Sequence, residues 1–315
     1  MANATASRLG QVDKTGDDKA LFEKVYAGEV LTAFETNVVL KELTRQRTIT
    51  HGKSASFPAV FKASGGYHTP GEELTGRAIS HTEVVINIDD LLVSDVFIAS
   101  IDEAMNHYDV RSVYSDEQGQ FLATQYDKNI ARNLIRAARG AALFTGDQGG
   151  SAIVDADANS NALSLAGSIW TAKQTMEEKD VPVDNVKVNC AVRPAQWYLL
   201  AQEPTLILNR DVDGDGSYSK GKFSMIGGVE VVKSNAFPWG VNDSTNTSLP
   251  VDYRIDMTNT VAVVFTEAAV GTVQLMGLGF ETAWDPRRRG TLMIAEYAVG
   301  HGPILTKCAV EIKIL

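Results

Sequence analysis

The chain has 315 residues, 44% of them hydrophobic and 22% charged, a composition typical of a globular protein of one large or two medium domains. Its 39 acidic and 29 basic residues give a formal net charge of −10. This argues against a dedicated nucleic-acid binder, because affinity for phosphate depends on clustered cations.

The N-terminal sequence MANATASR lacks the apolar stretch of a signal peptide, and no apolar run reaches the roughly 18 residues of a membrane span. We therefore expect a soluble, intracellular protein that has no contact with a membrane. Residues 1–20 are small, polar and charged, so they cannot fold alone. Residues 21–44 are amphipathic, and we expect them to form an arm that docks on another surface.

Residues 45–81 combine short β-type pieces with several glycines, and their apolar content is too low for an independent core. In the piece FPAVF at 57–61, Phe57, Ala59 and Phe61 share one strand face, while Pro58 favours an edge strand. The pattern predicts a long projecting hairpin or loop. Loops of this length in a compact domain are usually functional.

A strand pair and one long helix follow this loop. Residues 82–89 alternate apolar and polar side chains and predict a strand, which 91–98 continue. Residues 102–139 repeat apolar side chains at steps of three and four, which predicts a helix about 55 Å long. Gly140 is expected to cap its end, and Gly119 is expected to be its weak point.

The later elements lack regular βαβ alternation, so the fold class is α+β. Residues 144–161 are expected to form a loop and 162–178 a helix. In the last strand Cys308, Val310 and Ile312 define an apolar face, and Glu311 belongs to the opposite, polar face. The remaining predictions are strands at 186–190, 228–233, 260–265, 271–276, 291–298 and 306–314, and a helix at 195–201 that begins at Pro194.

Two cysteines, Cys190 and Cys308, are too few for a disulfide framework or a multi-cysteine zinc site, and both are expected to be buried in strands. The sequence DVDGDG at 211–216 matches the start of a calcium loop, with Asp211, Asp213 and Asp215 as candidate ligands. The twelfth position requires a bidentate glutamate but holds Lys222, whose charge opposes Ca²⁺. A polar surface turn is therefore the favoured interpretation, and no cofactor is expected.

No catalytic set of residues stands out. The sequence GEELTGRA at 71–78 approaches a phosphate-binding loop but lacks its lysine and its serine or threonine. The histidines are scattered and show no metal-ligand spacing; they are His51, His68, His81, His107 and His301.

The arm, the loop and the long helix each expose surface that one subunit alone would not satisfy, which points to an assembly. The basic triplet Arg287–Arg289 is isolated in an acidic chain. It is solvated surface, part of an ion pair between subunits, or a contact for DNA, in that order of preference. For an ion pair, Glu72 and Glu73 offer the opposite charge. The candidate intersubunit residues are Phe57, Glu72, Glu73, Arg287, Arg288 and Arg289.

Several stretches of the chain resemble a known family. The most specific is DEAMNHYDVRS at 102–112, preceded by SHTE at 80–83 and IDDLL at 88–92. Others are GEVLTAF at 28–34, GKSASFP at 52–58, PGEE at 70–73, GGVEVVKS at 227–234, AVGTV at 269–273 and AEYAVGHG at 295–302. These residues resemble the major capsid proteins of short-tailed, T-seven-like phages (podoviruses), over about 21–135 and 225–315.

The resemblance implies the Hong Kong 97-like fold. In its terms 1–45 is an N-terminal arm, 46–81 an extended loop, 82–184 a peripheral domain with a spine helix at 102–139, 185–270 an axial domain and 271–315 a return to the peripheral domain. The family builds hexamers and pentamers into an icosahedral shell. The implied partners are other copies of the chain, a scaffolding protein, a portal protein and enclosed double-stranded DNA. Assembly would take place in the host cytoplasm.

Two other classes of function remain open at this point. One is an α+β enzyme with a discontinuous active site under a mobile loop. The other is a calcium-dependent binding module that uses Asp211, Asp213 and Asp215. Neither explains the arm and the long helix.

Overall fold

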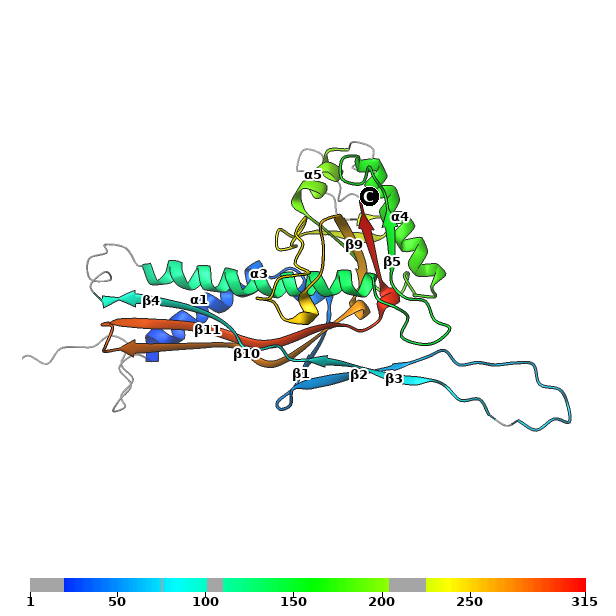
Figure 1. Cartoon of the computed structure of the whole chain (residues 1–315), viewed down its shortest axis with the longest axis horizontal. Helices are drawn as coiled ribbons and strands as arrows, with labels where there is room; N and C mark the ends of the chain where they lie inside the picture. The colour runs from blue at the N-terminus through cyan, green and yellow to red at the C-terminus, as the bar shows by residue number, and fades with distance from the viewer. Residues whose placement is uncertain (1–19, 75, 101–109, 204–224) are drawn as a thin grey trace, which may run out of the picture. The chain divides into compact units, whose positions relative to one another are not determined.

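The structure is a computed structural model that describes residues 20–74, 76–100, 110–203 and 225–315 (Figure 1). The chain divides into two compact units, and each unit collects three separate stretches. Unit 1 takes the stretches up to residue 38, 89–126 and 275–299, and unit 2 takes 39–88, 127–274 and 300–315. Within the described residues no helix is long and apolar enough to cross a membrane.

Unit 1 packs helices against a sheet. Its elements are helix α1 (Ala20–Asn37), strand β4 (Leu92–Ala99), the first half of helix α3 (Val110–Ala138), and the distal parts of β10 (Val270–Asp285) and β11 (Gly290–Pro303). Strand β11 pairs antiparallel with β4, from Gly290 opposite Ala99 to Tyr297 opposite Leu92, and β10 lies on its other side. The strands predicted at 91–98 and 291–298 are confirmed, and the one predicted at 271–276 is the beginning of the much longer β10.

The helices cover one face of this sheet. The burial pattern of β11 shows this, since its side chains alternate between buried and half-buried along the part that pairs with β4. Tyr297 on the buried face packs edge-on against Phe34 of α1 and Tyr126 of α3, with ring centroids 6.3 and 6.1 Å apart. Val30 and Phe34 of α1 are buried. The described part of the N-terminal arm therefore packs within its own subunit, which the sequence did not indicate.

Gly119 allows α1 and α3 to approach closely, so the expectation that it weakens the long helix is wrong. Helix α3 continues through it without interruption. A Cβ atom at position 119 would lie 2.7 Å from the carbonyl oxygen of Val30 and 2.7 Å from the Cβ of Ala33. The expected start of the helix at residue 102 lies outside the described residues.

A six-stranded sheet with the order β5-β12-β9-β6-β8-β7 forms the core of unit 2. Its strands are β5 (Ser151–Val154), β6 (Val188–Val192), β7 (Met225–Ile226), β8 (Val229–Lys233), β9 (Thr260–Thr266) and β12 (Ala309–Lys313). Strands β6 and β9 are buried along their whole length, which explains their nearly continuous apolar sequences. Helices α4 (Ala162–Glu178) and α5 (Pro194–Gln202) pack against this sheet.

Helix α4 has the predicted bounds, and its N-terminus is capped by Asn161. The Asn161 Oδ1 atom accepts the backbone N–H groups of Leu163 and Ser164 at 3.0 and 3.4 Å. The loop predicted at 144–161 was wrong in part, because it contains β5, which pairs parallel with β12. The strand β5 has only four residues and lies in a segment rich in glycine and aspartate, so its alternation is too short to be recognised in the sequence.

The prediction that Glu311 lies on a polar, exposed face of the last strand is wrong, because this residue is completely buried. Strand β12 lies between β5 and β9, and helix α4 packs against it. Both carboxylate oxygens of Glu311 accept from Arg139 at 2.6 Å, and the Thr260 hydroxyl adds a third bond at 2.5 Å. The charge-assisted pairing compensates the burial of the carboxylate.

The third sheet is a two-stranded hairpin of β2 (Ser54–Val60) and β3 (His81–Asn87). It is preceded by β1 (Arg45–Thr48), which pairs parallel with the start of β10. Ala55, Phe57 and Ile86 from the hairpin pack against Val273 and Ile304. The edge position inferred from Pro58 is confirmed, since β2 pairs only with β3 among the described strands. Short 3-10 turns are η1 (Lys41–Leu43), η3 (Val251–Tyr253), η4 (Glu267–Ala269) and η5 (Thr306–Cys308).

Candidate functional site

The segment between β2 and β3 leaves the hairpin as an open loop, which we call the 61–80 loop (Figure 1). Each described residue from 62 to 80 is exposed. Its largest apolar side chains are Tyr67, which is fully exposed, and Leu74, which is 80% exposed. Two large apolar side chains exposed on one projecting loop are available for contact with another protein.

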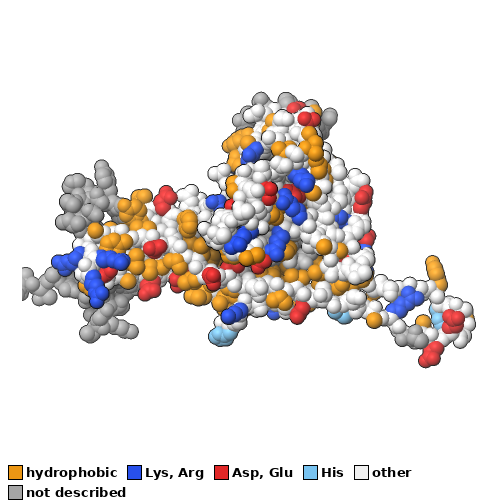
Figure 2. Space-filling model, in the orientation of Figure 1, with side chains coloured by type: hydrophobic (Ala, Val, Ile, Leu, Met, Phe, Trp, Pro, Cys, Tyr) orange, Lys and Arg blue, Asp and Glu red, His pale blue; other side chains and the backbone are white. Residues whose placement is uncertain are grey.

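The acidic pair Glu72 and Glu73 lies on the same exposed part of the loop. The backbone N–H of Glu72 donates to the carbonyl oxygen of Thr69 at 3.1 Å, which closes a turn. Figure 2 shows acidic side chains at the far end of the loop and basic side chains closer to the hairpin. Neither carboxylate is ion-paired with another described residue, so both remain available.

The base of the loop is fixed to the rest of unit 2. The Phe61 ring packs on the Phe144 ring, with centroids 5.1 Å apart. The Lys62 ammonium pairs with the Asp180 carboxylate and lowers the pKa of that carboxyl below its usual range. The sequence carries no local signal for Phe144 or Asp180 as partners of the loop, because they lie far from it along the chain.

The basic triplet occupies the turn between β10 and β11. The Asp285 Oδ1 atom accepts the backbone N–H groups of Arg287 and Arg288 at 2.8 and 3.3 Å, and Arg289 has a positive φ of 54°. This arrangement closes the turn with the three guanidinium groups outside it, and all three arginines are exposed. The Arg288 Nε atom also lies 3.7 Å from a carboxylate oxygen of Asp285.

One face of the unit 1 sheet is not covered by α1 and α3. On this face Val93 and Phe97 of β4 are each 40% exposed. Their neighbours across the ladder are Glu296 and Leu292 of β11. The same sheet therefore carries a partly apolar open face and, at one end, the basic turn.

The candidate intersubunit residues divide into two groups. Glu72, Glu73 and the three arginines are exposed, the acids in unit 2 and the arginines in unit 1. Phe57, in contrast, is 3% exposed and belongs to the core of unit 2. Its ring is covered by its own subunit, so Phe57 anchors the hairpin and is not available for contact with another copy.

Among the described residues, the other chemistry-bearing side chains do not converge on a centre. Both cysteines are buried, as expected, and burial raises the pKa of the Cys190 thiol to about 12. Burial lowers the pKa of His301 to about 3, so this imidazole stays neutral. The calcium candidates Asp211, Asp213 and Asp215 and also His107 lie outside the described residues, and the described part contains no group of three or more potential metal ligands.

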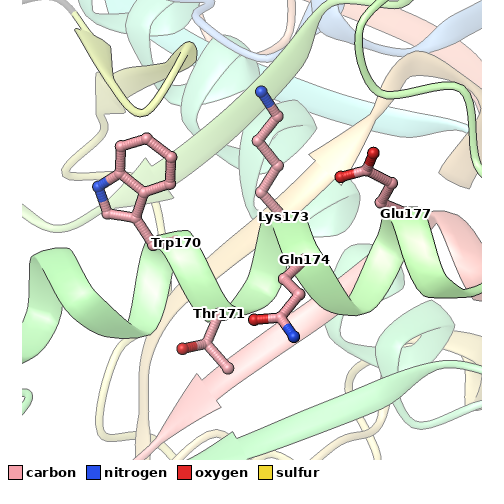
Figure 3. A pocket seen from close by; sticks show the side chains of 5 residues that line it. All are labelled: Trp170, Thr171, Lys173, Gln174 and Glu177. Atoms are coloured by element: carbon pink, nitrogen blue, oxygen red, sulfur yellow. The ribbon is translucent and has the colours of Figure 1, made fainter.

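A shallow hollow of about 230 Å³ lies along α4 (Figure 3). In Figure 3 Trp170, Lys173 and Glu177 project to one side of the helix, while Thr171 and Gln174 point to the other. The Lys173 ammonium already donates to the carbonyl oxygen of Gly227 at 3.2 Å. The Thr171 hydroxyl donates to the carbonyl oxygen of Gly167 at 3.0 Å, so among the described lining residues no nucleophile is hydrogen-bonded to a general base, as an active site would require.

Comparison with known proteins covers nearly the whole chain. Residues 56–313 match a family described as Gp10A-like, major capsid protein. The chain is 30% identical to the major capsid protein of Escherichia phage T7, over 93% of this chain and 92% of the relative. It is 29% identical to that of Enterobacteria phage T3, over 95% of this chain and 93% of the relative.

Solved capsid structures match the fold as well. The capsid structure of the cyanophage P-SCSP1u aligns with a TM-score of 0.78 and 41% identity, over 100% of this chain and 99% of that one. The mature capsid of bacteriophage PhiM1 aligns with a TM-score of 0.72 and 17% identity, over 88% and 87% of the two chains. The second match, at low identity, supports the fold alone.

Proposed function

Because the chain belongs to the Gp10A-like family of major capsid proteins, we propose that it builds a phage shell in which the 61–80 loop of one copy docks on a neighbouring copy. The resemblance to T-seven-like capsid proteins and the Hong Kong 97-like α+β fold are confirmed by the matches. The family is structural, so the chain is not an enzyme, and neither the enzyme nor the calcium-module alternative gains support.

The observation that carries the docking proposal is the loop itself. It holds Tyr67 and Leu74 in solvent together with the unpaired carboxylates of Glu72 and Glu73, while its base is anchored. An anchored loop that exposes a tyrosine and a leucine beside charged side chains offers an aromatic and apolar contact with a polar rim, the two parts of a protein–protein interface.

The receiving surface that fits this loop is the open face of the unit 1 sheet on another copy. Val93 and Phe97 on that face offer apolar contact for Tyr67 and Leu74. The arginine turn at 287–289 supplies the charge opposite to the two glutamates. Each exposed ion pair contributes only about 0.2–1 kcal/mol. A shell repeats the contact at every subunit, however, so a weak pair influences the whole assembly.

The finer organisation of the particle follows from the resemblance and is part of the proposal. The copies would form hexamers and pentamers of an icosahedral shell, assembled in the host cytoplasm with a scaffolding protein and a portal protein. Residues 1–45 would be the arm, 46–81 the extended loop, 82–184 and 271–315 the peripheral domain, and 185–270 the axial domain.

The enclosed cargo would be double-stranded DNA, held without sequence-specific contacts. The net charge of −10 suits a container wall, because a wall that bound DNA tightly would hinder packing and ejection. Purified subunits are therefore expected to retain little DNA at low salt. Tight retention would contradict this part of the proposal.

Charge reversal tests the docking contact. The variants Glu72→Lys with Glu73→Lys, and Arg287→Glu with Arg288→Glu, are each expected to lower the yield of closed shells. Combining all four changes should restore part of the yield, because the charges are again opposite. Shells are counted by negative-stain electron microscopy after size-exclusion chromatography, with the chain produced with and without a scaffolding partner.

Glu178→Lys, an exposed change on α4, is the matched control and should leave the yield unaltered. If neither reversal reduces the yield, the proposed pairing of glutamates and arginines is wrong. A stable monomer under all conditions, including the unaltered chain, would count against the shell function itself.

A further inference from the structure

We propose that Arg77 clasps the two limbs of the 61–80 loop together and holds the loop in its extended form before a neighbouring copy binds. This inference rests on the proposed function, since it concerns the same loop. It assigns Arg77 as a positioning residue for the contact between subunits. The contact residues themselves, Glu72 and Glu73, lie nearer the tip than Arg77 does along the returning limb.

The clasp is a single side chain that crosses the loop. The Arg77 Nη1 atom donates to the carbonyl oxygen of Gly65, which lies on the opposite limb, at 2.8 Å. A Cβ atom at the next position, Gly66, would lie 2.7 Å from the Arg77 Nη2 atom. The glycine therefore leaves the space that the guanidinium occupies, and the two limbs are complementary at this point.

Below the clasp the loop is held by other contacts. The backbone N–H of Phe61 donates to the carbonyl oxygen of Ser80 at 2.9 Å, which closes the two limbs at their base. Phe144 and Asp180 then tie the outgoing limb to unit 2. Beyond this base, among the described loop residues, the Arg77 bond is the side-chain bond that joins the limbs.

A clasp at this place has a direct consequence for assembly. A loop that is free beyond its base must lose conformational entropy when it docks, and this loss weakens the contact. A loop that is already closed by Arg77 has lost part of that entropy during folding. The residue also suits the task, because a guanidinium reaches across a gap on a long side chain and presents several donors to backbone oxygens.

The clasp can be measured in the unassembled subunit, independently of shell formation. Spin labels on His68→Cys in the loop and Glu178→Cys at the end of α4 both lie in unit 2 and are exposed. The native cysteines are buried and are not expected to compete for the label. Double electron–electron resonance on the full chain, kept below its assembly concentration, reports the distribution of distances between the labels.

We expect a narrow distribution for the parent and a broader one for Arg77→Ala. Gly66→Val should broaden it as well, because it displaces the guanidinium from the opposite limb without altering Arg77. The matched control is Lys53→Ala, which removes the same charge from an exposed position just before β2 and should leave the distribution narrow. Two outcomes would overturn the clasp. One is a label-distance distribution for Arg77→Ala that stays as narrow as that of the parent, and the other is a distribution that is already broad in the parent.

The concentration dependence of shell assembly provides a second, independent measurement. Arg77→Ala should raise the protein concentration needed for shells roughly three- to tenfold, the factor expected for the loss of one exposed hydrogen bond of ordinary strength. Lys53→Ala should not change it. Absence of shells from every variant and from the parent would refute the proposed function, while the label distances would still decide whether Arg77 clasps the loop.

Discussion

Two arginine–aspartate pairs on α3 differ mainly in burial, which makes the cost of a buried unpaired charge measurable. Arg132 lies 2.6 Å from Asp243, and the two side chains are 7% and 10% exposed. Arg136, one turn later, lies 2.7 Å from Asp252, and these side chains are 45% and 52% exposed. Arg132 donates through Nε and Nη2 to one carboxylate oxygen of Asp243, while Arg136 donates through Nη1 to a carboxylate oxygen and to the backbone carbonyl of Asp252. Each arginine thus makes two hydrogen bonds to its aspartate, and burial is the larger difference between the two sites.

We expect Arg132→Met to lower the free energy of unfolding by about 3–5 kcal/mol, because it leaves Asp243 charged in a site that water hardly reaches. The matched change Arg136→Met should cost about 1 kcal/mol or less, because solvent screens the remaining carboxylate. Urea unfolding of the unassembled chain, followed by tryptophan fluorescence, measures both values.

A double variant separates the charge from the packing. Asp243→Leu added to Arg132→Met removes the orphaned charge and should recover most of the lost stability. The reasoning fails if Arg132→Met costs no more than Arg136→Met, or if the double variant is as unstable as the single one.

Two further predictions concern stability. Asp127 is 1% exposed and accepts the backbone N–H groups of Val39 and Leu40 at 3.0 and 3.1 Å, and burial raises its pKa to about 6. Between about pH 4 and pH 6 the carboxyl of Asp127 is protonated in the folded state but ionised in the unfolded state. The stabilising contribution of Asp127 is therefore fully present below about pH 4 and is lost as the pH rises through 6. Relative to Asp127→Asn, the parent should lose about 2 kcal/mol between pH 4 and 7, and a constant difference would contradict the buried carboxyl. Gly119→Ala should lower the melting temperature although alanine favours helices by about 1 kcal/mol, because its Cβ would lie 2.7 Å from the Val30 carbonyl oxygen. The control Gly167→Ala in α4, where nothing lies within 4 Å, should raise it, and equal shifts would refute the close approach.

The sequence by itself determined the elements whose signals are local. The bounds of α4 followed from its helical spacing, and β9 was predicted from an apolar run that is buried on both faces. The strand β6 was predicted from alternating side chains at 186–190, two residues too early, and its predicted polar position Asn189 is buried. The exposed loop was recognisable from its glycines and its low apolar content, and so were Glu72, Glu73 and the arginine turn as exposed charges. The family was also recognisable, since its motifs are short and continuous.

The tertiary structure alone decided how distant side chains pair. Glu311 alternates as a solvent-facing residue would, yet it is buried, because Arg139, which follows the end of α3 and lies 172 positions earlier in the chain, pairs with its carboxylate. Phe57 is a large aromatic residue in the projecting segment and was therefore expected to contact another copy, but Val273 and Ile304 cover it within the subunit.

The same holds for the parts that position the loop. Lys62 meets Asp180 across 118 positions, and Arg77 meets Gly65 across a loop without regular pairing. A periodic pattern records which face of an element is apolar. It does not record which remote carboxylate or carbonyl a charged side chain will meet, because that depends on how the folded chain brings separate segments together.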